Sequence, residues 1–265
     1  MHEGEVMADG NMKETALKAV HEAGKILMDG LGRVHEINYK REIDLVTEID
    51  RLSEERIVTM IRKQYPDHEI LAEEGGTRKG SSSYRWIIDP LDGTTNYAHG
   101  YPCFCISIAL EEAGEVTYGV VYDPTREELF ITEKGKGAKL NGKPISVSKT
   151  EKLTNSLLCT GFPYDIREGR ETNLNHFQKF MMKSQAVRRD GAAALDLCYV
   201  AAGRFDGYWE LKLSPWDVAA GSLLVKEAGG TVTDFEGKDF TLSSPKILAS
   251  NGRIHREMVE VLMGM

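Results

Sequence analysis

The chain has few cysteines, and none of them belongs to a recognisable metal or redox motif. The four cysteines lie in apolar surroundings without a CxxC pair, at Cys103, Cys105, Cys159 and Cys198. The seven histidines form no HExxH or other zinc spacing. We therefore expect reduced core thiols and no zinc motif. Any metal bound by this chain should be held by oxygen.

Long apolar runs are also missing. The longest one spans residues 103–110, is interrupted by Ser107, and is far too short to cross a bilayer. The first eleven residues are polar and acidic, without the basic start and apolar stretch of a secretory signal. We expect a cytoplasmic protein with no membrane partner. Met12 is an alternative start of translation, because the residues before it add no apolar periodicity.

The chain has no excess of positive charge. It carries 33 basic and 41 acidic residues, for a net charge of -8, which argues against a general nucleic-acid binder. Carboxylates gathered around metal ions would themselves make a chain acidic. The remaining composition, 41% hydrophobic and 28% charged, is that of a globular protein with room for a large core.

No internal repeat and no Pro-, Gly- or Ser-rich linker divides the 265 residues. Apolar spacing predicts helices over 12–31, 47–65, 170–183, 191–202, 215–228 and 253–262. Strand patterns cover 84–88, 103–110, 115–122, 129–132, 156–160, 186–189, 205–210, 231–234 and 247–250, and Asn141-Gly142 marks a hairpin. We expect an α+β subdomain over 1–148 and an α/β subdomain over 149–265, sharing one core as a single catalytic unit.

The most informative stretch is WIIDPLDGTTNYAHG, residues 86–100, where apolar residues lead into two carboxylates. Pro90 restricts Asp89 to an extended backbone, so we expect the strand to end at Asp89 and the chain to turn. The turn would leave Asp89 and Asp92 close together, with the Leu91 carbonyl between them. Such an oxygen shell suits Mg²⁺, which binds few protein oxygens and keeps positions for water and phosphate. Without a cation, carboxylates this close would repel each other.

Gly93, Thr94 and Thr95 follow these carboxylates directly and can open a helix. A helix start offers backbone N–H groups to an anion, and the threonines add hydroxyls. Carboxylates for a metal beside donors for an anion indicate a phosphate ester as the ligand. The alternative is that DPLDGTT is only a turn, because Asp, Pro and Gly are common turn formers.

Two further acidic stretches weaken that alternative. Glu73 and Glu74 follow the apolar residues 70–72 at an expected strand end, although such a pair is often only solvated surface. Residues 214–217, SPWD, read as a helix start with serine as N-cap and proline at the first helical position. Asp217 would either contribute to a site or only favour the helix dipole.

Taken together, these stretches resemble the inositol monophosphatase family of Mg²⁺-dependent, often lithium-sensitive phosphatases. The matching segments follow the family's order and nearly its spacing: 44–50 (DLVTEID), Glu73-Glu74, 86–96, Gly137-Ala138 with Asn141-Gly142, and Trp216-Asp217. The resemblance implies a layered αβαβα sandwich with the site between the two subdomains. It also implies hydrolysis of a phosphate monoester by a metal-activated water, without a covalent phosphoenzyme.

The resemblance assigns roles to particular residues of this chain. Two or three Mg²⁺ ions, with Mn²⁺ as an alternative, would be held by Glu73, Asp89, the Leu91 carbonyl, Asp92 and Asp217. Asp89 would bridge two of the ions, and Glu73 would also serve the nearby waters. Thr94 with Asp50 would orient or deprotonate the attacking water. For Asp50 the alternative role is that of a helix cap.

The family pattern also implies substrate contacts. Phosphate would be received by Gly93, Thr94 and Thr95, and the hydroxylated leaving group by Gly191, Ala192, Ala193 and Glu210. Glu74 and Trp216 would support the site. The alternative for Glu210 is a polar strand end without a role in binding. Lys40 is a candidate in a stretch, with Arg41, that departs from the family's forms, so their role stays open.

Several functions remain compatible with these motifs. The first is hydrolysis of inositol monophosphate or a similar polyol phosphate. Fructose-1,6-bisphosphatase and 3'-phosphoadenosine 5'-phosphate phosphatase share the metal ligands, and Arg188 and Arg189 could serve a second phosphate. Some family members also act as binding partners in the transcription machinery, which is the non-enzymatic alternative. From the family we expect a homodimer whose ligand is a small phosphate monoester.

Overall fold

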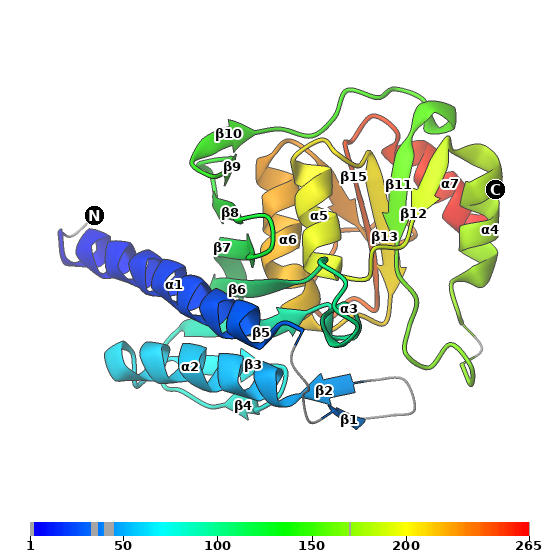
Figure 1. The fold of residues 1–265 in the computed structure, drawn as a ribbon. Coiled ribbons are helices and arrows are strands. Elements are labelled where there is room, and N and C mark those ends of the chain that lie inside the picture. Colours follow the sequence, from blue (N-terminus) through cyan, green and yellow to red (C-terminus); the bar gives the residue numbers. More distant parts are fainter. Residues whose placement is uncertain (1–2, 33–36, 40–44, 170, 265) are drawn as a thin grey trace.

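A computed structural model describes residues 3–32, 37–39, 45–169 and 171–264 of the 265-residue chain. The backbone is built in five layers (Figure 1). Two sheets alternate with three pairs of helices, namely α1 (Glu3–Gly30) with α2 (Glu48–Gln64), α5 (Ala193–Ala201) with α6 (Pro215–Glu227), and α4 (Leu174–Lys183) with α7 (His255–Met263). This arrangement confirms the expected layered αβαβα sandwich. Lys40 and Arg41 lie outside the described residues.

The larger sheet has eight strands in the order β10-β9-β8-β7-β6-β5-β3-β4. Its strands are β3 (Glu69–Ala72), β4 (Gly76–Arg78), β5 (Tyr84–Asp92), β6 (Cys105–Glu112), β7 (Glu115–Asp123), β8 (Glu128–Glu133), β9 (Ala138–Leu140) and β10 (Lys143–Ile145). All neighbours are antiparallel except β3 and β5. The predicted hairpin joins β9 to β10, with positive φ at both Asn141 and Gly142.

The smaller sheet has five strands in the order β12-β11-β13-β15-β14. Its strands are β11 (Leu157–Thr160), β12 (Ala186–Arg188), β13 (Gly207–Leu211), β14 (Thr231–Thr233) and β15 (Lys246–Ser250). Strand β11 runs parallel to both of its neighbours, and β15 runs antiparallel to β13 and β14. The remaining elements are the pair β1 (Ile37–Tyr39) and β2 (Leu45–Thr47), the short helix α3 (Thr94–Ala98) and a 3₁₀ turn, Leu153–Asn155.

The core continues from one sheet to the other through the middle helix layer. Every residue of α5 is buried, and so are residues 218–225 of α6. One apolar cluster joins these helices to inward residues of both sheets, from Ile87 and Val121 to Tyr208 and Ile247. Helices that are apolar all round are those enclosed by other layers. Two further clusters lie beneath the outer helix pairs.

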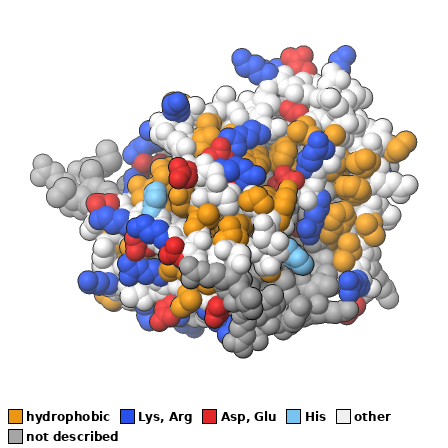
Figure 2. Space-filling model, viewed as in Figure 1, with side chains coloured by type: hydrophobic (Ala, Val, Ile, Leu, Met, Phe, Trp, Pro, Cys, Tyr) orange, Lys and Arg blue, Asp and Glu red, His pale blue; other side chains and the backbone are white. Residues whose placement is uncertain are grey.

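The surface carries charge of both signs. On the face drawn in Figure 2, basic and acidic side chains are interspersed with apolar ones. Among the described helices, none combines the length and the apolar character needed to cross a membrane.

Several element boundaries differ from the predicted ones. Helix α1 begins at Glu3, upstream of residue 12. Helices α4 and α5 begin later than predicted, because Asn173 has φ 68° and Gly191 has φ 82°, which a right-handed helix does not accept. The prediction that the strand ends at Asp89 is wrong, because β5 continues to Asp92.

Candidate active site

The acidic residues singled out in the sequence converge on one cavity. The cavity has a volume of about 690 Å³ and lies where β3, β5 and α3 meet β13 and the start of α6. It is lined by ten of the predicted site residues, Glu73, Glu74, Asp89, Leu91, Asp92, Gly93, Thr94, Glu210, Trp216 and Asp217. Residues from both sequence halves therefore form one site.

A β-bulge positions the first two carboxylates. Asp89 pairs with Ser107 and Asp92 with Cys105, so β5 carries one more residue than β6 across this interval. Pro90 falls within the bulge, where its missing N–H leaves no ladder bond unmade. Its carbonyl accepts a 2.8 Å hydrogen bond from the Ser53 hydroxyl. The strand thus changes course without ending, and both aspartates stay beside the cavity.

Asp92 faces the N-terminus of α5. Its Oδ2 accepts a 2.7 Å hydrogen bond from the Ala194 backbone N–H, and the Cys105 thiol lies 3.6 Å away. Burial raises the pKa of Asp92 to about 6, against the lowering by these donors. The helix terminus favours the ionised carboxylate, while the apolar surroundings oppose it. The predicted contact residues Ala192, the N-cap of this helix, and Ala193, its first residue, are buried.

Asp217 belongs both to a helix cap and to the cavity. The Ser214 N–H donates to Asp217 Oδ2 at 2.7 Å, and Ser214 in turn caps the third helical residue, which forms a capping box. Pro215 occupies the first helical position, as predicted. The helix role and the site role expected for Asp217 are therefore compatible, because the carboxylate lies in the first turn of α6 and also lines the cavity.

The electrostatics of this group fit divalent cations. The pKa of Asp89 is raised well above its usual range, first by burial and then by the negative charges of Glu73, Asp92 and Asp217. Burial, Asp92 and Glu73 likewise raise the pKa of Asp217. Buried carboxylates that repel one another, together with an all-oxygen donor set, are the chemistry that Mg²⁺ selects.

These carboxylates are not the tightest acidic group of the protein. Within the described ranges, only Cys159, Asp190 and Asp196 bring three potential metal-binding atoms within 4.8 Å of one another. That trio was not among the residues predicted to bind metal.

Thr94 and Asp50 are connected directly. The Thr94 hydroxyl lies 3.0 Å from Asp50 Oδ1 and 3.1 Å from the Leu91 carbonyl, so it can donate to either acceptor. Asp50 is 1% exposed and lies in the first turn of α2, which already begins at Glu48. Its carboxylate therefore reaches towards Thr94 from inside the helix. Gly93, which precedes Thr94, has φ 90° at the N-cap of α3.

Glu210 enters the cavity from β13. It is 7% exposed, and the Tyr208 hydroxyl donates to its Oε2 at 2.5 Å. Burial raises the pKa of Glu210 to about 7, against the lowering by Tyr208 and Arg189. A Cβ on Gly161 would lie 2.1 Å from Glu210 Oε2, so only glycine leaves room for this carboxylate.

Four predicted substrate contacts do not line the cavity, namely Thr95, Gly191, Ala192 and Ala193. The segment 191–193, which leads into α5 and contains three of them, is nevertheless tied to α3. The Asn96 side-chain amide donates to the carbonyl of Asp190 at 2.8 Å and lies 3.4 Å from that of Gly191. Their contact with a substrate remains a prediction.

The cavity also contains residues that the sequence did not indicate. The loop 162–165 and Lys212 lie along its wall. Lys212 Nζ is 2.6 Å from Asp165 Oδ2, and Tyr164 is 50% exposed. No motif marks these residues. They come together because β11, which precedes the loop, pairs with β13, which precedes Lys212.

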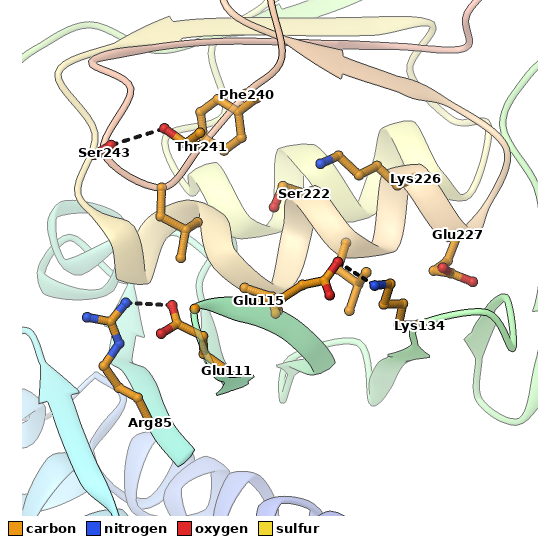
Figure 3. Close-up of a pocket in the computed structure, with 14 residues that line it drawn as sticks. Arg85, Glu111, Glu115, Lys134, Ser222, Lys226, Glu227, Phe240, Thr241 and Ser243 are labelled. Atoms are coloured by element: carbon orange, nitrogen blue, oxygen red, sulfur yellow. Dashed lines mark hydrogen bonds and ion pairs between the residues drawn. The ribbon is translucent and has the colours of Figure 1, made fainter. Parts of the chain in front are cut away.

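A second cavity of about 530 Å³ lies against α6 and contains none of the predicted site residues (Figure 3). Its charged side chains largely pair with each other. Arg85 lies 2.5 Å from Glu111, and Lys134 forms an ion pair with Glu115. This cavity lacks the convergent carboxylates of the first one.

Comparison with known proteins gives a consistent result. Residues 9–263 match the model of the inositol monophosphatase family. The chain is 45% identical to a Nus factor SuhB of Pseudomonas aeruginosa, covering 95% of both chains. It is 47% identical to an inositol-1-monophosphatase of Synechocystis, covering 94% of this chain and 88% of the relative. An inositol monophosphatase structure from Anabaena (Nostoc) superposes with a TM-score of 0.88 at 45% identity, covering 97% and 96% of the two chains.

Proposed function

The chain belongs to the inositol monophosphatase family, and from this premise we propose that it hydrolyses inositol monophosphate or a similar polyol phosphate. Members of this family hydrolyse phosphate monoesters with the help of metal ions. The observation that carries the proposal is the shared cavity. The predicted metal-binding carboxylates, Thr94 and Glu210 all line it, and Asp50 accepts a hydrogen bond from Thr94.

The proposed cofactor is Mg²⁺, with two or three ions per site and Mn²⁺ as an alternative. The ligands would be Glu73, Asp89, the Leu91 carbonyl, Asp92 and Asp217. When bound, such cations lower the pKa of a water molecule and offset the charge of a phosphate group. The all-oxygen donors and their mutual repulsion support this assignment.

The protein's own groups would position the reactants. Thr94 would hold the attacking water by a hydrogen bond, and Asp50 would accept the proton that Thr94 passes on. Gly93, whose φ of 90° turns the chain at the start of α3, would present its N–H to the phosphate, and Thr95 would add a hydroxyl. Trp216 and Glu74 line the wall and would support the ligands.

The leaving group would be recognised at the opposite wall. Glu210, oriented by Tyr208, would accept hydrogen bonds from hydroxyl groups of the alcohol. The loop 191–193 would complete this contact. A polyol satisfies these acceptors, whereas an aryl group does not, so specificity would depend on hydroxyl recognition.

A substrate panel tests the proposal. Phosphate release is measured with inositol 1-phosphate, fructose 1,6-bisphosphate and 3'-phosphoadenosine 5'-phosphate, each with and without Mg²⁺. We expect Mg²⁺-dependent release, with the highest kcat/KM for inositol 1-phosphate. A clear preference for either bisphosphate would contradict the proposed substrate. It would indicate that the exposed Arg188 and Arg189 bind a second phosphate.

Glu210→Gln tests the leaving-group contact. We expect kcat/KM for inositol 1-phosphate to fall by about tenfold or more, because the substrate hydroxyls lose their acceptor. An aryl phosphate without those hydroxyls should be affected much less. Glu111→Gln, which also neutralises a buried glutamate but lies in the second cavity, is the matched control. Equal losses on both substrates would assign Glu210 a structural role.

A second candidate function is binding to the transcription machinery. The name of the Pseudomonas relative, a Nus factor, favours it. Co-elution of the purified chain with bacterial RNA polymerase would support this function, and the Asp89→Asn variant would show whether it depends on catalysis. Binding that persists in a variant without turnover would establish two separate functions.

We also propose that the chain forms a homodimer, as the family resemblance implies. Light scattering of the purified protein measures its molar mass directly. A mass of twice the single chain supports the dimer, and a monomer would contradict it.

A further inference from the structure

A cluster of one thiol and two carboxylates lies apart from the catalytic carboxylates. Cys159 is on β11, Asp196 is in the first turn of α5, and Asp190 is in the loop that leads into this helix. One potential ligand atom from each residue lies within 4.8 Å of the others. Segments far apart in the sequence therefore bring three metal-binding side chains to one point.

Asp196 is the unusual member of this cluster. Its side chain is 1% exposed, and among the described residues neither of its oxygens has a hydrogen-bond partner of standard geometry. Buried carboxylates are normally paired or hydrogen-bonded, because an isolated one is costly. The charges that act on Asp196 are negative, from Asp190, Glu210 and Asp92, while the Cys159 thiol beside it is the group that favours its ionised form. Arg188 and Arg126 act on Asp190 at the edge of the cluster, whereas no positive charge is among the groups that shift the pKa of Asp196.

We propose that Cys159, Asp190 and Asp196 form a second metal site, which binds a thiophilic divalent cation of the zinc class. A thiolate with carboxylates suits borderline-soft ions such as Zn²⁺, Co²⁺ and Cd²⁺, whereas Mg²⁺ selects oxygen alone. The donor chemistry thus separates this site from the oxygen-lined active site. The inference goes beyond the phosphatase function and does not depend on it.

Binding would exchange protons for the metal. Burial raises the pKa of the Cys159 thiol and of the Asp196 carboxyl well above their usual ranges. The cation would replace the thiol proton and any proton on Asp196, and these protons would leave to solvent. Asp190 is the member of the cluster that is only partly buried, so the cation would approach from its side.

The site has a structural path to the active site. Asn96, next to the predicted phosphate contacts, donates to the Asp190 carbonyl. Asp92 accepts from Ala194, two residues before Asp196 on α5. A cation that joins β11, the loop before α5 and α5 itself would hold this loop in place. The loop contains Gly191 and Ala192, which are predicted to contact the leaving group together with Glu210.

Cadmium provides a direct test, because a Cd²⁺–thiolate bond absorbs in the ultraviolet and carboxylate ligation does not. The metal-depleted full chain is titrated with Cd²⁺ while excess Mg²⁺ occupies oxygen sites. We expect a thiolate charge-transfer band that saturates at one Cd²⁺ per chain. The band should disappear in Cys159→Ala, and Asp196→Asn should weaken the affinity by about tenfold to a hundredfold.

Cys105→Ala is the matched control, because Cys105 is also buried and lies 3.6 Å from the predicted ligand Asp92. This variant should retain the band. Asp196→Asn keeps the side-chain shape, so it tests the site even if Cys159→Ala fails to fold. The proposal is overturned if the wild type shows no band, if the band is lost with Cys105, or if Asp196→Asn leaves the affinity unchanged.

Discussion

Asp217 illustrates why the role of a single acidic residue is hard to read from sequence. In the sequence, Ser214 and Pro215 predict a helix start, and Asp217 would either contribute to a site or favour the helix dipole. The structure confirms Ser214 as the N-cap and adds a capping box with Asp217. The same side chain also lines the cavity beside Asp89 and Asp92. Local rules predicted the helix start at Ser214 and Pro215, whereas the like charges around Asp217 come from segments far away in the chain. At this scale the sequence predicted which residues matter, and the fold shows that the two roles coexist.

Asp50 allows the catalytic role to be tested at one residue. Asp50→Asn removes the charge of the carboxylate that accepts a hydrogen bond from the Thr94 hydroxyl, and it keeps a similar side-chain shape. We expect kcat to fall by about a hundredfold or more, the range of a lost general base, with melting temperature and Mg²⁺ affinity nearly unchanged. Steady-state kinetics and thermal denaturation measure these effects.

The control for this variant is Glu55→Gln, an exposed charge loss on the same helix. Adding Thr94→Ala to Asp50→Asn should reduce kcat little beyond the worse single variant, because groups that act as one unit are not additive. Strictly multiplicative losses in kcat would show that Asp50 and Thr94 act independently. A nearly fully active Asp50→Asn enzyme would reduce Asp50 to a structural residue of α2.

At the scale of elements, periodicity predicted most helices and strands, but not the bulge in β5. The sequence predicts a strand end at Asp89 because the rule for residues before proline is local. Pairing with β6 continues past it, with one extra residue accommodated between Asp89 and Asp92. Neighbouring strands decide whether a proline ends a strand or lies in a bulge, and that information is absent from a local window.

The turn from β5 into α3 depends on Gly93. Its φ of 90° disfavours other residues, and an added Cβ would lie 2.8 Å from the Cys103 carbonyl oxygen. The left-handed backbone costs about 1–2 kcal/mol for alanine, and overpacking adds about 1–3 kcal/mol. We therefore expect Gly93→Ala to lose about 2–5 kcal/mol of unfolding free energy, measured by urea denaturation.

Gly100 provides the matched comparison. It also has positive φ, 69°, but nothing lies within 4 Å of the position of its Cβ. Gly100→Ala should therefore lose only the backbone contribution, about 1–2 kcal/mol. Equal losses at the two glycines would show that the close approach to Cys103 does not constrain the turn.

At the scale of the whole molecule, the family resemblance predicted the layers and most of the cavity, because its motifs cover the ends of the strands that meet there. Residues without a motif were missed. Cys159 and Asp196 are separated by a helix and a strand, and only the packing of α5 against β11 brings them together. Lys212 and the loop 162–165 likewise reach the cavity through tertiary contacts. Such proximity cannot be derived from spacing in one sequence.

The buried acids predict how pH and metal together affect the stability of the whole protein. A carboxyl whose pKa is raised by folding stabilises the protein below its unfolded pKa, and this contribution is lost as pH rises through the folded pKa. For Asp92 the change from 3.8 to about 6 corresponds to about 3 kcal/mol. Without metal, this contribution should be lost by about neutral pH, and Glu210, with a pKa of about 7, adds to the loss.

Divalent cations bind the ionised carboxylates and should reverse this effect. We expect the gain in Tm on adding Mg²⁺ to grow from about pH 5 to about pH 7.5, because protons no longer compete for the ligands. Measuring the difference with and without Mg²⁺ cancels the opposite contribution of His255, whose pKa is lowered to about 4 by burial. A gain in Tm that is independent of pH would argue against cation binding at these acids.

Asp89→Asn tests the central claim, that buried carboxylates of β5 make this protein a metal-dependent phosphatase. Phosphate release from inositol 1-phosphate is measured for wild type and variant over a range of Mg²⁺ concentrations, with circular dichroism as the control for folding. The wild type should require Mg²⁺, and the variant should lose about a thousandfold or more of its turnover while staying folded, because the amide removes charge where the cations would bind. A folded variant with turnover within a few-fold of wild type, or a wild type equally active without divalent cations, would contradict the account.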